Sequence, residues 1–172
     1  LLQKAEEQGA TDYISAKDGN GSTVLNLAAG NWKLEMVEFL VLFLLGKNAD
    51  VTIADEDGKT PLHFIARTDR TDIAKLLLQK AEEQGATDYI SAKDCDGRTV
   101  LNLAMAASKC GMVEFLLEKG CDFTFADDFG EHCLHQICYS SDRTDMVDLL
   151  LQKAEEQGVI DYINAKSEVG RT

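Results

Sequence analysis

The chain repeats its own sequence at long intervals. The segment LLQKAEEQGATDYISAKD at 1–18 returns unchanged at 77–94, and an altered copy, LLQKAEEQGVIDYINAKS, occupies 150–167. Between these copies lie shorter matching segments: STVLNLA at 22–28, KTPLHFIA at 59–66, RTVLNLA at 98–104 and EHCLHQIC at 131–138. Self-similarity at intervals of roughly 20–50 residues is typical of chains that fold as a row of stacked units. We therefore expect an array rather than one closed core.

Recurring glycines set the register of the repeat. They precede each shorter segment and follow the last long one, at Gly21, Gly58, Gly97, Gly130 and Gly170. Their spacings are 37, 39, 33 and 40 residues, which indicates a basic unit of 33 residues with insertions of four, six and seven. An aspartate three residues before a glycine marks a tight turn, because glycine adopts backbone conformations that other residues resist.

Helix signals follow each turn. In the second complete unit, Thr60 can cap the free N–H groups of a helix, and Pro61 at the first helical position loses no hydrogen bond. We expect a short helix over 61–66, a polar break at 67–72, and then a longer helix whose apolar side chains share one face. Since no unit can bury that face alone, neighbouring units must complete the core.

These motifs carry a resemblance to a known family. The segment DEDGKTPLHFIA at 55–66 is similar to the ankyrin signature D-x-x-G-x-T-P-L-H-x-x-A, and the uninterrupted unit at 94–126 resembles a complete ankyrin repeat. The resemblance covers essentially the whole chain. It implies an all-α fold: an ankyrin-repeat solenoid of stacked helix-turn-helix pairs with β-turn or hairpin loops, right-angled L-shaped units and an open concave groove.

The register divides this single ankyrin-repeat domain, 1–172, at each Asp-x-x-Gly turn. The predicted parts are a partial repeat at 1–17, repeats at 18–54, 55–93, 94–126 and 127–166, and the start of a further repeat at 167–172. Neither end has the polar cap that an array needs. We therefore expect neighbouring repeats on a longer, multidomain protein.

The insertions are departures from the family pattern. Two of them include about one extra helical turn in LLLQKAEEQG, at 76–85 and 149–158. The insertion in the first complete repeat, within VLFL at 41–44, is apolar, so either the neighbouring long helix or an outside partner must cover it. The third complete repeat carries no insertion, and we expect a notch on the convex face between its longer neighbours.

Charge and composition argue against several functional classes. The net charge of −13 opposes binding to nucleic acid, which depends on Lys and Arg side chains. The acidity is compatible with a basic protein partner, or it simply keeps an extended surface soluble. The longest apolar run, at 39–45, is too short for direct membrane insertion. Five cysteines without a CxxC pair indicate reduced thiols and a cytoplasmic, intracellular protein.

One cluster contains residue types that can bind a metal or take part in catalysis. His132, Cys133, His135 and Cys138 could bind zinc by type, but four ligands on one short helix cannot all turn to one metal. His135 and His63 occupy a structural position of the ankyrin pattern, and both cysteines fall where side chains face neighbouring repeats. Cys133 and His135 lie on different helix faces, which disfavours a nucleophile–base pair. We therefore predict no enzyme activity, no metal and no cofactor.

The resemblance also implies where a partner binds. In ankyrin arrays the turn tips and first helices line the concave groove, and aromatic and arginine side chains concentrate binding energy. The predicted partner-binding residues are Trp32, Glu56, Asp57, Lys59, Arg67, Asp96, Arg98, Asp128, Phe129 and Tyr139. Alternatively, Phe129 covers the next turn and Trp32 packs on the adjacent helix pair. By the same resemblance, the loop residue Asn164 is a candidate for asparaginyl hydroxylation.

Two functions remain open at this point. The first is a scaffold module that binds another protein through the concave surface, with acidic turn tips that favour a basic segment. The second is a structural or assembly element, either a spring or an oligomer-packing array in the cytosolic part of a larger membrane or filament protein.

Overall fold

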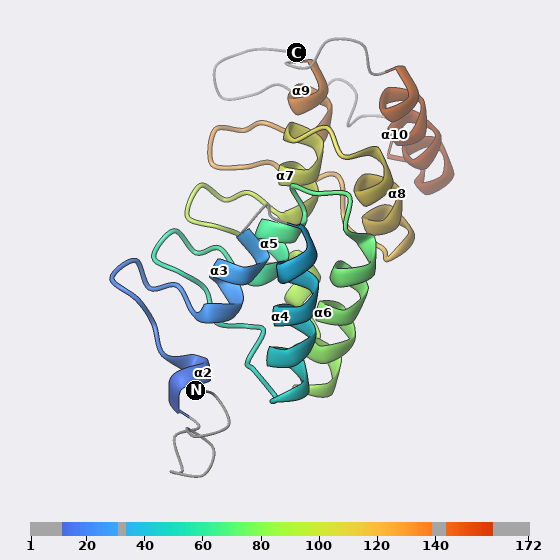
Figure 1. Ribbon diagram of the computed structural model, residues 1–172. Helices are drawn as coiled ribbons and strands as arrows, with labels where there is room; N and C mark the ends of the chain where they lie inside the picture. Colours follow the sequence, from blue (N-terminus) through green and yellow to red (C-terminus); the bar gives the residue numbers. More distant parts are fainter. Residues whose placement is uncertain (1–11, 31–33, 139–143, 160–172) are drawn as a thin grey trace.

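The computed structural model describes residues 12–30, 34–138 and 144–159, whose helices alternate between an inner and an outer row (Figure 1). The inner row contains α3 (Val24–Gly30), α5 (Pro61–Ile65), α7 (Val100–Ala106) and α9 (Cys133–Cys138). The outer row contains α4 (Leu34–Gly46), α6 (Thr71–Glu83), α8 (Cys110–Glu118) and α10 (Thr144–Gln157). Two shorter elements are α2 (Asp12–Ser15) and the 3-10 turn η1 (Tyr89–Ser91).

These helices form four consecutive pairs, which we number as the first to fourth repeats: α3–α4, α5–α6, α7–α8 and α9–α10. Each inner helix packs on its own outer helix and on the next inner helix, and successive outer helices pack on one another. The described residues form no β-strand, only two isolated β-bridges that join Lys17 to Thr23 and Lys93 to Thr99. The expected all-α stack of helix pairs is confirmed.

A continuous apolar interior runs through all four pairs. Leu62 and Leu101 are fully buried on successive inner helices, and Leu77 and Leu116 are fully buried on successive outer helices. Small buried residues let the inner helices approach closely, namely Ala28, Ala66 and Ala104. The interior therefore continues from one repeat to the next, as expected for units that complete one another's core.

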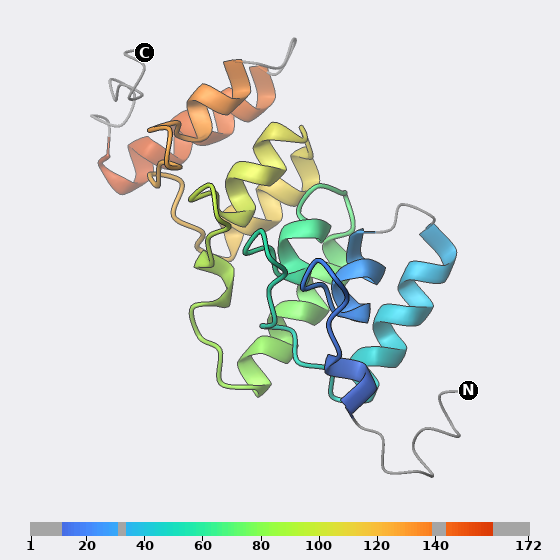
Figure 2. The same ribbon diagram turned by 90° about the vertical axis from the view of Figure 1, so that its left-hand side faces the viewer.

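The loops before the inner helices, which we call the finger loops, are 18–22, 55–59, 94–98 and 127–131. Figure 2, viewed from their side, shows them following one another along the array. In each loop the Oδ1 atom of the aspartate accepts two backbone N–H groups; Asp55, for example, accepts from Asp57 at 3.0 Å and Lys59 at 2.8 Å. The glycine of each turn has the predicted left-handed conformation, with φ of 71° at Gly21, 74° at Gly58, 72° at Gly97 and 71° at Gly130.

One backbone hydrogen bond ties the tip of each finger loop to the next. The donor N–H and acceptor carbonyl belong to Glu56 and Asn20 (3.0 Å), Cys95 and Asp57 (2.8 Å), and Asp128 and Asp96 (2.9 Å). The same bond recurs between every two described neighbours. The spacing of the finger loops is therefore fixed at their tips.

A side chain near the start of α3 joins the first repeat to the second. Asn26 accepts the hydroxyl hydrogen of Thr23 at 2.6 Å. Its Nδ2 atom donates to the carbonyls of Ile53 at 3.2 Å and Lys59 at 3.1 Å, which lie on either side of the second finger loop. The second finger loop is thus held at its base as well as at its tip.

His63 takes the equivalent position in the second repeat. It is fully buried, its Nδ1 atom accepts the N–H of Thr60 at 3.1 Å, and its Nε2 atom has no partner in hydrogen-bonding geometry. Burial lowers the pKa of His63 below its ordinary value of 6.5, and the weaker effects of the Asp94 carboxylate and of the Ala92 and Arg98 carbonyls oppose this. His63 is therefore neutral at pH 7, as the accepting role of Nδ1 requires.

The outer helices differ in length in the way the insertions predict. α4 and α6 have 13 residues, α10 has 14 and α8 has nine. In the extra turns, Ala81 is buried inward. Within the apolar insertion of α4, Val41 and Leu44 are fully buried, whereas Leu42 is 45% exposed, so most of this segment packs internally. Among the helices described, none is both long and apolar enough to span a bilayer.

The buried imidazole predicts acid-sensitive stability. As the pH falls below the ordinary value of 6.5, the unfolded chain takes up a proton at His63 that the folded protein resists. The free energy of unfolding should then fall by at most about 1.4 kcal/mol per pH unit for this one proton. His63→Asn, which introduces the residue found in the first and third repeats, should remove this contribution. Urea unfolding at a series of pH values measures it, and an unchanged pH slope in the variant would contradict the assignment.

A glycine is required at position 97 because the backbone there is left-handed and because a neighbouring loop leaves no space for a side chain. A Cβ atom there would lie 2.9 Å from the backbone nitrogen of Asp128. Gly97→Ala should lower the free energy of unfolding by about 1–2 kcal/mol from the left-handed conformation alone. The matched control is Gly120→Ala, since Gly120 has the same left-handed conformation, with φ of 81°, and nothing lies within 4 Å of the added Cβ. If both substitutions had the same effect on urea unfolding, the close approach of the finger loops would not contribute to stability.

Candidate functional site

The inner side of the array carries a hollow between the first two finger loops. It encloses about 590 Å³. Leu27 of α3 and Phe64 of α5 form its floor, and residues 55–57 of the second finger loop form an acidic rim. Leu27 is 53% exposed, whereas Leu25 in the same helix is 1% exposed. The hollow therefore offers accessible apolar surface next to three carboxylates.

The hollow depends on a glycine at the end of the first inner helix. A Cβ atom at Gly30 would lie 3.1 Å from Cδ1 of Phe64. The second and third repeats carry Arg67 and Ala106 at this position. Gly30 thus leaves the edge of an aromatic ring accessible beside the acidic rim.

The acidic rim is only partly neutralised by the chain itself. Lys59 pairs with Asp57 at 2.9 Å, and this hydrogen bond raises the pKa of Lys59 despite the opposing effect of burial. Glu56 forms no ion pair with any described residue. The first finger loop has the uncharged Ser22 where the next two loops have Lys59 and Arg98. A net negative charge therefore remains between the first two finger loops.

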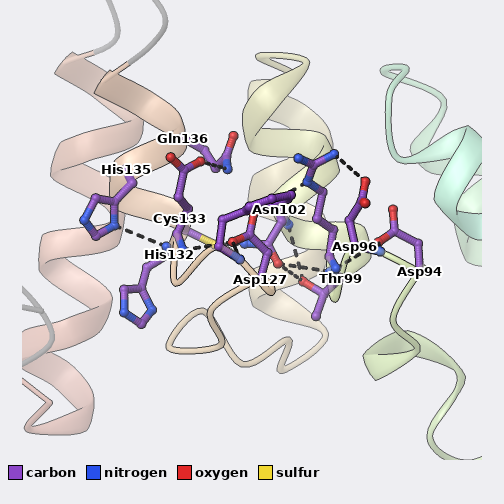
Figure 3. Close-up of polar contacts among 12 residues, drawn as sticks. Asp94, Asp96, Thr99, Asn102, Asp127, His132, Cys133, His135 and Gln136 are labelled. Atoms are coloured by element: carbon purple, nitrogen blue, oxygen red, sulfur yellow. Dashed lines mark hydrogen bonds and ion pairs between the residues drawn. The ribbon is translucent and has the colours of Figure 1, made fainter. Parts of the chain in front are cut away.

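Arg98 joins the third and fourth finger loops. Its guanidinium contacts Asp96 at 3.0 Å and the buried Asp127 at 3.5 Å. It also lies 5.7 Å from the ring centre of Phe129, which is 50% exposed. Figure 3 shows the two carboxylates beside Thr99, at the start of α7. The guanidinium of Arg98 is thus already engaged in contacts within the array. Phe129 contacts the neighbouring finger loop through Arg98, and part of its ring stays accessible.

The predicted binding residues fall into three groups. Arg67 is exposed immediately after α5. Trp32, Tyr139 and the candidate modification residue Asn164 lie outside the described residues. The remaining predicted residues lie on the finger loops: Glu56, Asp57, Lys59, Asp96, Arg98, Asp128 and Phe129. Their role in binding stays a prediction.

The sequence analysis missed the apolar floor of the hollow. Leu27 and Phe64 follow directly after Asn26 and His63. The signal was present, because Leu27 is an apolar residue that does not share the face of the buried Leu25 and Ala28. Single exposed apolar residues are ordinary on protein surfaces, so it is the presence of Leu27 and Phe64 together in one hollow that indicates a binding surface.

The histidine and cysteine cluster of α9 has structural contacts. His132 and His135 stack with ring centres 5.5 Å apart, and the N–H of His132 donates to Nδ1 of His135 at 3.2 Å. Cys133 is buried 3.8 Å from Nδ2 of Asn102 on α7, as Figure 3 shows. Burial raises the pKa of the Cys133 thiol to about 12, which keeps it protonated and unreactive. Cys138 is exposed at the end of the last described inner helix, and its contact with a neighbouring repeat stays a prediction.

No three His, Cys, Asp or Glu side chains gather as a metal site within the described parts of the chain. Cys121, the other buried cysteine, also has a pKa raised to about 12 by burial. The described inner side therefore presents hydrogen-bonding groups, charge and apolar surface, and its buried thiols are protonated.

Known proteins share this repeat pattern. A family model described as ankyrin repeats, in three copies, matches residues 1–88 and again residues 40–127. The chain is 35% identical over 118 residues to the Neurogenic locus notch homolog protein 1 of Xenopus tropicalis, covering 69% of this chain and 4% of that protein. It is 34% identical over 128 residues to the human protein of the same name, covering 74% of this chain and 5% of that protein. The chain spans only a small part of these relatives. With the family match extending over most of its length, the chain belongs to the ankyrin-repeat family.

Proposed function

We propose that this array is a protein-binding module of a larger scaffold and that its concave side holds a basic segment of another protein. Arrays of this kind use extended concave surfaces for binding. The observation that supports the proposal most strongly is the hollow between the first two finger loops, with its apolar floor and acidic rim.

The two parts of the hollow contribute differently to recognition. Burying the exposed surface of Leu27 and the edge of Phe64 supplies affinity, at about 25 cal/mol for each Å² of apolar surface removed from water. The carboxylates of the rim supply selectivity for Lys or Arg and accelerate encounter with a basic partner. The best match is a segment in which a bulky apolar residue adjoins a Lys or Arg residue. The net charge of −13 gives the whole array the same preference.

The proposed role is binding without catalysis. A nucleophilic cysteine needs a thiolate, and burial keeps the thiol of Cys133 protonated at neutral pH. The five cysteines all lie in the described part of the chain and form no disulfide there, and from this we infer a reducing, cytoplasmic location.

A second candidate function is the side-by-side assembly of arrays. It is supported by the outer helix α4, on which Phe39 is 72% exposed and Leu42 is 45% exposed. Multi-angle light scattering at increasing protein concentration distinguishes this function from the first. A strictly monomeric array at high concentration would count against assembly through α4.

The concave site predicts that charge reversal on the finger loops abolishes partner capture. Proteins captured from cell extract and identified by mass spectrometry should be lost from the variant Glu56→Lys with Asp128→Lys. The matched control is Glu114→Lys with Glu155→Lys, which changes the net charge equally on exposed residues of the outer helices. The control should retain the same proteins, since the concave side is unchanged.

Binding measurements with a captured partner then test whether the interaction depends on the charges of the finger loops. Calorimetry should show binding about tenfold or more weaker to the finger-loop variant, and an affinity for the unchanged array that falls as salt rises. Equal affinities for the two variants, or capture that is insensitive to both, would reject the concave site.

A further inference from the structure

The outer side of the array carries a second hollow, at the end of the shortest outer helix. It encloses about 360 Å³ between α6, the segment that follows α6, and the end of α8. Leu78, Ala86 and Ile90 give it an apolar lining, and each of them is half-buried. Ionic groups at its edge belong to Lys75, Glu82 and Lys119.

The hollow arises from a missing helical turn. α8 has nine residues, whereas its neighbours α6 and α10 have 13 and 14. The four-residue difference from α6 corresponds to about 6 Å of helix. The extra turn of α6 therefore extends past the end of α8. The insertion lengths predict a notch between α6 and α10; the hollow lies on the α6 side of α8, and none of its lining residues belongs to α10.

The same missing turn leaves one lysine without its partner. Lys80 of α6 pairs with Glu83 at 3.0 Å, and Lys153 of α10 pairs with Glu156 at 2.7 Å. Both glutamates lie in the extra turns. Lys119 has the same position in α8, but the chain leaves the helix at Gly120, whose φ is 81°. In place of a carboxylate, the ammonium group of Lys119 lies 5.9 Å from the ring centre of Phe115.

A second lysine at the hollow has the opposite charge to the residues found at the same position in the other repeats. Lys75 of α6 stands where the other three outer helices carry an acid, at Glu38, Glu114 and Asp148. Neither Lys75 nor Lys119 forms an ion pair with a described residue, and Glu82 is the one carboxylate among the lining residues. A chain with a net charge of −13 thus has a locally cationic edge around an apolar hollow.

We propose that this hollow binds a helical segment of a partner protein that presents a bulky apolar side chain and an adjacent glutamate. Such a segment takes the place of the missing turn. Its apolar side chain covers Leu78 and Ile90, and its carboxylate pairs with Lys119 as Glu83 pairs with Lys80. The site lies on the outer row, so it is independent of the concave surface and takes a partner of the opposite charge.

A helix-stapled peptide with a leucine and two glutamates on one face is the probe that tests this site. Titration into the isotopically labelled chain should shift the amide resonances around Leu78, Ile90 and Lys119. The control peptide has lysines in place of the glutamates and should cause no such shifts. Binding should weaken about tenfold in Lys119→Gln, because a hydrogen bond between charged groups is lost. Lys75→Glu should weaken it at least as much.

Lys153→Gln is the matched control, since it removes the equivalent lysine of α10 outside the hollow and should leave peptide affinity unchanged. A second variant inserts Ala-Glu-Glu-Gln after Lys119 and so restores the missing turn. It should fold, with a helix content by circular dichroism at least as high as that of the unchanged chain, and should no longer bind the peptide. Absence of shifts at about 1 mM peptide, where even weak complexes form, would overturn the proposal. Equal binding by the insertion variant would overturn it as well.

Discussion

The stack depends on side chains that make contacts in two repeats at once. Asn26 completes the start of its own helix through Thr23 and donates its amide hydrogens to carbonyls on both sides of the next finger loop. Buried polar groups left without a partner cost about 1–3 kcal/mol each. Loss of a neighbouring repeat would therefore leave unpaired amide and carbonyl groups in addition to an uncovered apolar interior. Hydrogen bonding and hydrophobic burial therefore both require a neighbouring repeat.

These attachments order the finger loops of the inner side, where we propose that a partner binds. The second finger loop is fixed at its base by Asn26 of the preceding repeat, and successive finger loops are joined at their tips by backbone hydrogen bonds such as that from Cys95 to Asp57. The aspartate of each turn also accepts two N–H groups within its own loop. Groups that are already ordered lose little conformational entropy when a partner binds. The acidic rim and the floor formed by Leu27 and Phe64 are accordingly held in place before any partner arrives.

The sequence predicts those features that depend on residues close together along the chain. The Asp-x-x-Gly turns, the Thr60-Pro61 helix start and the unequal lengths of the outer helices are all of this kind. Features that depend on contact between repeats were not predictable in the same way. Arg98 is held by Asp127 of the next repeat, and the missing side chain of Gly30 matters only because Phe64 lies beside it. The regular spacing of the repeats predicts which positions lie opposite each other in neighbouring repeats. It does not predict which side chains at those positions make contact.

The charges of the two sides have different consequences for the kinetics of binding. A net charge of −13 attracts a basic segment toward the finger loops from a distance, so its association should be fast and sensitive to salt. An acidic segment is repelled at long range and gains only from Lys75 and Lys119 at short range. At physiological salt the repulsion fades beyond about 8 Å, the Debye length. Added salt therefore weakens both the repulsion and the local attraction, and the outer hollow must select through its apolar lining as much as through charge.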